Sequence, residues 1–185
     1  MATPESKMSR LIIVVALLLC TLQAGCVSRA RREVVGAVRG ASGKVVILES
    51  TSNLAKFRGM SVGSIQVAAG LEVPNEIPEM VRQAYLDAGA DLGLSASGSP
   101  SLQVSGEIIH YETAGTIDHA IGPLEEIIVR TRLDESGSEQ PLGQANLVGR
   151  SKTTTSSGRH HLAKGAGKAL KKWLKKSGLK QQEDD

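Results

Sequence analysis

The chain has 185 residues, a formal net charge of +3, one tryptophan, two tyrosines and one phenylalanine. So few aromatic rings argue against a surface on which bases or sugars stack. Two cysteines are too few for a disulfide-rich domain or a cysteine-based zinc site. The length suits one domain with an aliphatic core.

The first 25 residues have the features of a secretory signal. Lys7 and Arg10 give a positive start, the apolar run Leu11–Leu19 follows, and Ala24 and Gly25 are small residues. The apolar run is shorter than the roughly 20 residues that span a bilayer. We therefore expect residues 1–25 to be cleaved from the mature protein.

Cys26 follows Ala24-Gly25 in a pattern that resembles the lipobox of bacterial lipoproteins. The resemblance implies that a peptidase cuts between Gly25 and Cys26, and that the cysteine carries acyl chains. Gln23 stands where the lipobox usually has leucine, so an ordinary signal peptide or an uncleaved anchor remains as an alternative. Two or more acyl chains hold a protein stably on a membrane.

Cys20 would leave with the signal, so the mature chain would keep only Cys26. We therefore expect no disulfide, no metal and no cofactor beyond the covalent lipid on Cys26. Enteric sorting retains lipoproteins with aspartate after the cysteine at the inner membrane, whereas this chain has Val27 there. This indicates the periplasmic face of the outer membrane rather than the inner membrane.

After the signal, three segments are expected in chain order. Residues 26–43 mix arginine and glycine and should form the lipidated N-terminus and a tether. Residues 44–177 should form the folded domain, and residues 178–185 a polar tail.

The first elements expected in the domain are two strands and a helix. Lys44–Glu49 is a short apolar strand, and Met60–Ala69 alternates with Ile65, Val67 and Ala69 on one face and a bulge at Gly63. The helix begins with Asn75 as its cap, and Gly89 ends it. Its apolar stripe contains Ile77, Met80, Val81, Ala84, Tyr85 and Ala88.

Three strands and a second helix follow. Ser101–Thr113, Leu124–Leu133 and Pro141–Thr155 are joined by turn-rich links and predict an antiparallel meander. In the helix Ser156–Ser177, one side carries Leu162, Ala166, Ala169, Leu170 and Trp173, with Leu174 at its margin. Gly165 and Gly167 weaken this helix. Together the elements predict a two-layer α+β domain, a mainly antiparallel sheet packed with two helices.

This order of elements resembles a family of bacterial lipoproteins known only as domain of unknown function 4410. The matching features are a strand near Ser61–Ala69, a helix like Glu76–Ala88, a glycine-bearing stretch like Gly106–Gly122, the turn Asp134-Glu135-Ser136-Gly137, the strand start Leu142-Gly143 and a last amphipathic helix. The resemblance covers about 120 residues. It implies an envelope lipoprotein and brings no established activity.

Gly59-Met60-Ser61-Val62-Gly63 matches the G-x-S-x-G pattern of serine hydrolases. That pattern requires a strand before the serine and a helix after it, whereas a strand-like run follows here. A small envelope hydrolase therefore stands as the alternative function. It would need Ser61, Glu107, His110 and His119 to converge in one cleft.

The histidines and glutamates give weak signals for other chemistry. His110, His119, His160 and His161 lack metal-ligand spacing, so no metal site is expected. An acid–base pair for sugar hydrolysis could come from Glu107, Glu112, Glu125 and Glu126, but Glu125 and Glu126 should face opposite sides of a strand. We expect no catalytic residues.

Charge is concentrated near the C-terminus, where Arg150–Lys180 contains basic residues and no acidic one. The last helix should expose Lys164, Lys168, Lys171, Lys172 and Lys175 opposite its apolar side. These lysines either form a solvated surface or bind anionic lipid head groups or an acidic polymer. Nucleic acid is not expected, because an exported chain leaves the compartment that holds it.

The function expected from the sequence is a non-catalytic binding or accessory domain. It would be tethered to a membrane of the cell envelope through Cys26 and present a surface to an envelope protein or an anionic polymer.

Overall fold

The computed structural model describes residues 41–112, 125–138, 141–150 and 158–179. Residue packing divides the chain into two units, Met1–Arg39 and Gly40–Asp185, and all described residues belong to the second. The predictions for residues 1–25, for Cys26, for the tether up to residue 40 and for His119 lie outside the described residues. Ser42 and Gly43, which were expected in the tether, instead lie in the first strand. No described helix is long and apolar enough to cross a membrane.

The described part of the chain is built on one five-stranded sheet in the order β1-β5-β4-β3-β2. Its strands are β1 Ser42–Glu49, β2 Gly59–Val67, β3 Ser101–Glu112, β4 Glu126–Glu135 and β5 Pro141–Arg150. β3, β4 and β5 form the predicted antiparallel meander, and β1 pairs antiparallel with β5. The predicted α+β class with a mainly antiparallel sheet is confirmed.

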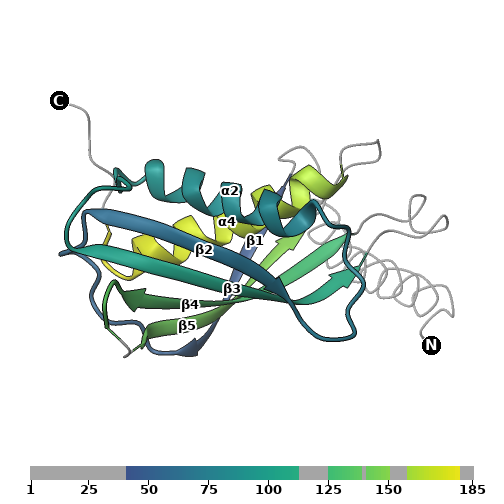
Figure 1. Cartoon of the computed structure of the whole chain (residues 1–185), viewed down its shortest axis with the longest axis horizontal. Helices are drawn as coiled ribbons and strands as arrows, with labels where there is room; N and C mark the ends of the chain where they lie inside the picture. Colours follow the sequence, from purple (N-terminus) through teal and green to yellow (C-terminus); the bar gives the residue numbers. More distant parts are fainter. Residues whose placement is uncertain (1–40, 113–124, 139–140, 151–157, 180–185) are drawn as a thin grey trace, which may run out of the picture. The chain divides into compact units, whose positions relative to one another are not determined.

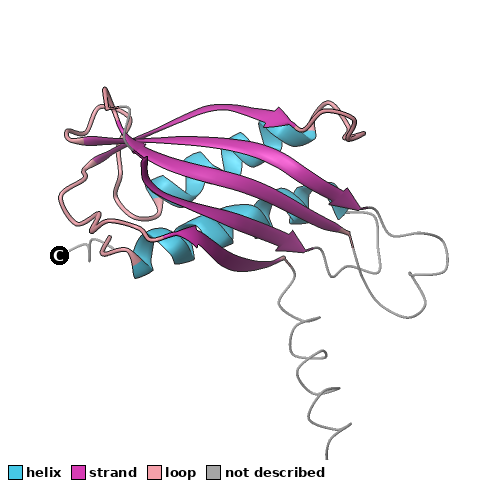
Figure 2. Cartoon of the chain, turned by 90° about the horizontal axis from the view of Figure 1, so that it is seen from below, coloured by secondary structure: helices cyan, strands magenta, loops and turns pink. Residues whose placement is uncertain are grey.

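Two helices, α2 Ile77–Ala90 and α4 Gly158–Lys176, lie side by side on one face of this sheet (Figure 1). α4 packs over β1 and β5, whereas α2 packs over β2. Figure 2 shows the sheet from its other face, which carries no helix among the described elements. We call this the open face.

β2 and β3 pair in parallel, which the predicted meander did not include. Parallel neighbours need a crossover, and α2 supplies it between the two strands. The register of β2 against β3 shifts between Val62 and Ile65, so the bulge predicted at Gly63 is confirmed. Ile65 is buried, but Val67 lies exposed near the end of the strand.

The boundaries of α2 differ from the prediction. The residue before its first turn is Glu76, with no side-chain cap, so the expected cap at Asn75 is wrong. Gly89 does not end the helix, which continues to Ala90. A Cβ at Gly89 would stand 2.2 Å from Cε of Met60, so this glycine makes room for a side chain of β2.

The core fills the space between the sheet and the two helices. Every second residue from Leu102 to Ile108 on β3 and from Ile127 to Leu133 on β4 is buried, among them Val104 and Val129. The apolar side of α4 is buried as predicted, and Leu174, expected at its margin, is fully buried too. Leu179, expected in the polar tail, is also buried.

One polar pair crosses this core. The hydroxyl of Tyr85 on α2 lies 2.8 Å from Oγ1 of Thr131 on β4, and both side chains are fully buried. Burial raises the pKa of Tyr85 well above its usual value. A buried hydroxyl without a partner is costly, so this pair fixes where α2 sits on the sheet.

Glycines set the distance between α4 and the sheet. A Cβ on Gly165 of α4 would stand 2.7 Å from the carbonyl oxygen of Ser42 and 2.9 Å from Cα of Gly149. A Cβ on Gly149 of β5 would stand 2.3 Å from the carbonyl oxygen of Leu162. Gly165, which sequence reasoning treated only as a weak point of the helix, is therefore a position of close backbone contact.

Candidate functional site

Four lysines form one exposed row along α4. Lys164, Lys168, Lys172 and Lys175 are exposed and recur every three or four residues, which places them on one side of a helix. We call them the lysine stripe. α4 contains no acidic residue. The predicted basic surface is therefore present on these four positions.

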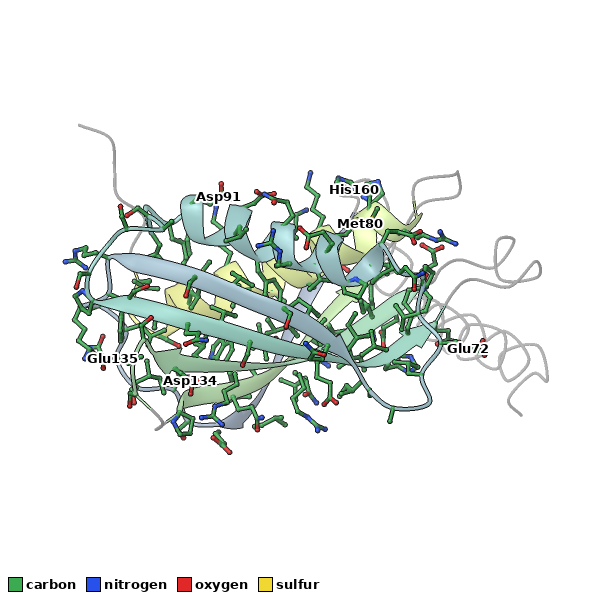
Figure 3. The ribbon with its side chains drawn as sticks, viewed as in Figure 1. Glu72, Met80, Asp91, Asp134, Glu135 and His160 are labelled. Carbon is green, nitrogen blue, oxygen red and sulfur yellow. The ribbon has the colours of Figure 1, made fainter. Side chains whose placement is uncertain are left out.

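Lys171 does not belong to the lysine stripe, although the sequence placed it there. Its Nζ lies 2.7 Å from Oδ2 of Asp91, and only 27% of its side chain is exposed. Asp91 follows the end of α2 (Figure 3). Lys171 therefore joins the two helices at their shared surface, and its charge is partly neutralised.

Lys168 connects the lysine stripe to the start of the described chain. Its Nζ donates a hydrogen bond of 2.9 Å to the carbonyl oxygen of Ala41. Ala41 directly precedes β1, so this lysine joins α4 to the residue before the first strand.

The hydrolase pattern does not form a nucleophile elbow. Ser61 lies within β2, and its Oγ donates to the carbonyl oxygen of Leu102 at 3.4 Å. A nucleophile elbow needs a turn from strand to helix at the serine. The described residues that a hydrolase would need do not converge either, because Ser61 pairs with Gln103 and Glu107 lies four residues further along β3. That separation is about 13 Å along the strand.

The described histidines lie at two separate places, one on β3 and one at the start of α4. His110 lies near the end of β3, with Nε2 3.6 Å from a carboxylate oxygen of Glu112. His160 and His161 stand at the start of α4 with their rings edge to face (Figure 3 labels His160). Within the described ranges, no three histidine, cysteine or acidic side chains are close enough to hold a metal ion.

The candidate acid–base glutamates are divided among different partners. Glu112 on β3 faces Glu126 on β4, and Glu126 pairs with Arg150 on β5. Glu107 lies on β3 opposite Arg130. Glu125 precedes β4. This arrangement joins strands through charged side chains and places no described pair of carboxylates across a cleft.

A cluster that sequence reasoning missed joins the starts of both helices to β3. Arg159 of α4 pairs with Glu76 before α2. The pKa of Glu76 is lowered by its own backbone amide and by Arg159. Burial raises the pKa of Tyr111 on β3, and the charge of Arg159 opposes that effect. The only sequence signal was opposite charges at distant positions, which do not identify a pair.

The fold is similar to the folds of solved structures. The chain is similar to PelC from Paraburkholderia phytofirmans, solved as a dodecamer in two crystal forms, with TM-scores of 0.52 and 0.51 and 12% and 14% identity. The alignments cover 76% of this chain and 99% of PelC. A protein of the family DUF330 from Xanthomonas campestris matches with a TM-score of 0.42 and 14% identity, over 68% of this chain and 86% of its own.

No protein-family model and no curated protein sequence matches the chain. The resemblance to domain of unknown function 4410 therefore stays a prediction. At identities this low, the likeness to PelC shows that the two chains share a fold.

Proposed function

We propose that this chain is a lipid-anchored, non-catalytic accessory protein of the bacterial cell envelope, whose lysine stripe meets anionic lipid head groups. The observation that carries the proposal is the exposed row Lys164, Lys168, Lys172 and Lys175 on a helix without acidic residues. The lipobox-like sequence supports the anchor at Cys26, and Val27 supports the outer membrane.

The hydrogen bond from Lys168 to Ala41 supports a lysine stripe that lies within reach of an anchored membrane. Lys168 bonds to Ala41, and the chain from there back to Cys26 reaches at most about 50 Å when fully extended. A lipid on Cys26 would therefore keep the domain within that distance of the bilayer. Each lysine close to an anionic surface contributes about 1 kcal/mol, so even a few oriented lysines would favour one face of the domain toward the membrane.

The anchor is tested by replacing its cysteine. Cys26→Ala is expected to abolish incorporation of radiolabelled palmitate, because the sulfur is the acylation site. The variant Cys20→Ala is the matched control and should label like the wild type. Undiminished labelling of Cys26→Ala would refute the lipobox assignment.

The lysine stripe is tested by chemical labelling of the full lipoprotein in vesicles. An amine-reactive reagent is applied with phosphatidylcholine alone or with added phosphatidylglycerol, and mass spectrometry gives the rate at each lysine. We expect Lys164 and Lys172 to react about fivefold more slowly in the anionic vesicles, which corresponds to about 1 kcal/mol per lysine.

Lys56 is the internal control, since it lies on the link before β2, outside the lysine stripe, and pairs with Glu135. Its rate should not depend on the lipid. Equal protection of Lys56 and the stripe lysines would contradict a specific orientation. Protection by a soluble acidic polymer, with none by anionic vesicles, would assign the stripe to a polymer instead.

A further inference from the structure

β1 forms one edge of the sheet and exposes an apolar run. The exposed fractions of Val46, Ile47 and Leu48 are 41%, 50% and 45%, and the only other large exposed apolar side chain in the described ranges is Val67. An edge strand also leaves one row of main-chain donors and acceptors unpaired by the sheet. Soluble proteins usually protect such an edge with charges or cover it.

The pairing of β1 with β5 fixes which side chains of β1 share a face. Lys44, Val45, Val46, Ile47 and Glu49 lie opposite five consecutive residues of β5, from Val148 back to Gln144, and Leu48 is the extra residue of a bulge. Side chains alternate along a strand. Lys44, Val46 and Glu49 therefore lie on the open face, and Val45 and Ile47 on the helix face.

This arrangement is complementary to itself. When two copies of β1 run antiparallel about Val46, Lys44 of one copy stands opposite Glu49 of the other, on the same face. Val46 meets Val46 of the second copy on that face, and Val45 meets Ile47 on the helix face. Without the bulge at Leu48, Glu49 would lie on the opposite face from Lys44.

We infer that two copies of this chain pair through β1 and form a continuous ten-stranded sheet. The partner is a second copy, because a twofold axis at Val46 brings the lysine of each copy opposite the glutamate of the other and the apolar residues together. Such a contact uses the same surface on both copies, so the assembly stops at a dimer. The inference goes beyond the proposed function and does not depend on it.

The opposite edge of the sheet does not offer an equivalent surface. The exposed residues of β2 include Ser61, Ser64 and Gln66, and its ladder is interrupted between Val62 and Ile65. A polar edge offers little apolar surface to bury against a second copy. Val67 on β2 therefore supplies a matched control, since it is an exposed valine on the edge that should stay unpaired.

The experiment is disulfide cross-linking of the full chain in cells. Val46→Cys places its sulfur near the twofold axis, where opposite Cβ atoms stand about 5 Å apart and a disulfide can form. We expect oxidant to convert Val46→Cys to a covalent dimer, whereas Val67→Cys stays largely monomeric. Equal or faster cross-linking of Val67→Cys would overturn the inference.

Charge reversals test the antiparallel register. In the Val46→Cys background, Lys44→Glu alone or Glu49→Lys alone places like charges opposite each other twice, and cross-linking should slow about tenfold. Co-expression of the two reversed chains with different tags should restore the rate for the mixed dimer only. Failure of the mixed dimer to recover would overturn the pairing of Lys44 with Glu49.

The cross-linking result can be distinguished from a failure of the lipid anchor. Cross-linking is measured in whichever cell fraction holds the protein, so loss of lipidation and loss of pairing give different results. Protease resistance of each variant shows that it is folded. A folded Val46→Cys that remains monomeric at the membrane and in solution would refute the contact.

Discussion

Replacement of Trp173 by alanine is expected to lower the free energy of unfolding by about 4 kcal/mol. Trp173 is the largest fully buried side chain in the described ranges, and 1% of it is exposed. Its Nε1 donates a hydrogen bond of 2.7 Å to Oγ1 of Thr51 in the link between β1 and β2. The substitution removes a large apolar volume and leaves the Thr51 hydroxyl without its partner.

The loss is measured by urea denaturation followed by far-ultraviolet circular dichroism, because the variant contains no tryptophan for fluorescence. Lys172→Ala, one position earlier and exposed, is the control and should change stability by less than about 0.5 kcal/mol. Trp173→Phe should fall between the two, because it keeps most of the apolar contact and loses the hydrogen bond. A loss below about 1 kcal/mol for Trp173→Ala would show that this ring does not hold α4 to the sheet.

The fold class followed from local periodicity, because each element buries one side. The alternation of Ile127, Val129 and Leu133 and the spacing of Leu162, Ala166 and Leu170 depend only on neighbours along the chain. The parallel pairing of β2 with β3 depends on how α2 crosses the sheet. No local pattern encodes that crossing, so the sequence alone left the pairing open.

The lysine stripe was predictable for the same reason, since charged residues opposite an apolar side become exposed. Lys171 was the exception because Asp91, eighty residues earlier, is brought to it by the packing of α4 on α2. The cluster of Glu76, Tyr111 and Arg159 draws one residue from each of three segments. The self-complementary face of β1 depends on a bulge at Leu48, and no residue type in the strand predicts that bulge.

For a substitution at Gly165, helix propensity and tertiary packing predict opposite changes in the free energy of unfolding. Helix propensity alone predicts that Gly165→Ala stabilises α4 by about 1 kcal/mol. The structure places the added Cβ 2.7 Å from the carbonyl oxygen of Ser42 and 3.0 Å from the amide nitrogen of Arg150. Both atoms belong to the sheet backbone, so relief requires α4 to move away from β1 and β5.

We expect Gly165→Ala to lower the free energy of unfolding by about 2 kcal/mol, since overpacking in a closely packed contact typically costs 1–3 kcal/mol. Urea denaturation measures the change. Gly63→Ala is the matched control, because its added Cβ would lie 3.8 Å from the nearest atom, the carbonyl oxygen of Val104, and should leave stability nearly unchanged. A more stable Gly165→Ala variant would mean that the space between α4 and the sheet can hold the added methyl group. Helix propensity would then determine the change in stability. A loss of stability in Gly165→Ala but not in Gly63→Ala would instead show that the lack of a side chain at Gly165 allows α4 to lie this close to the sheet.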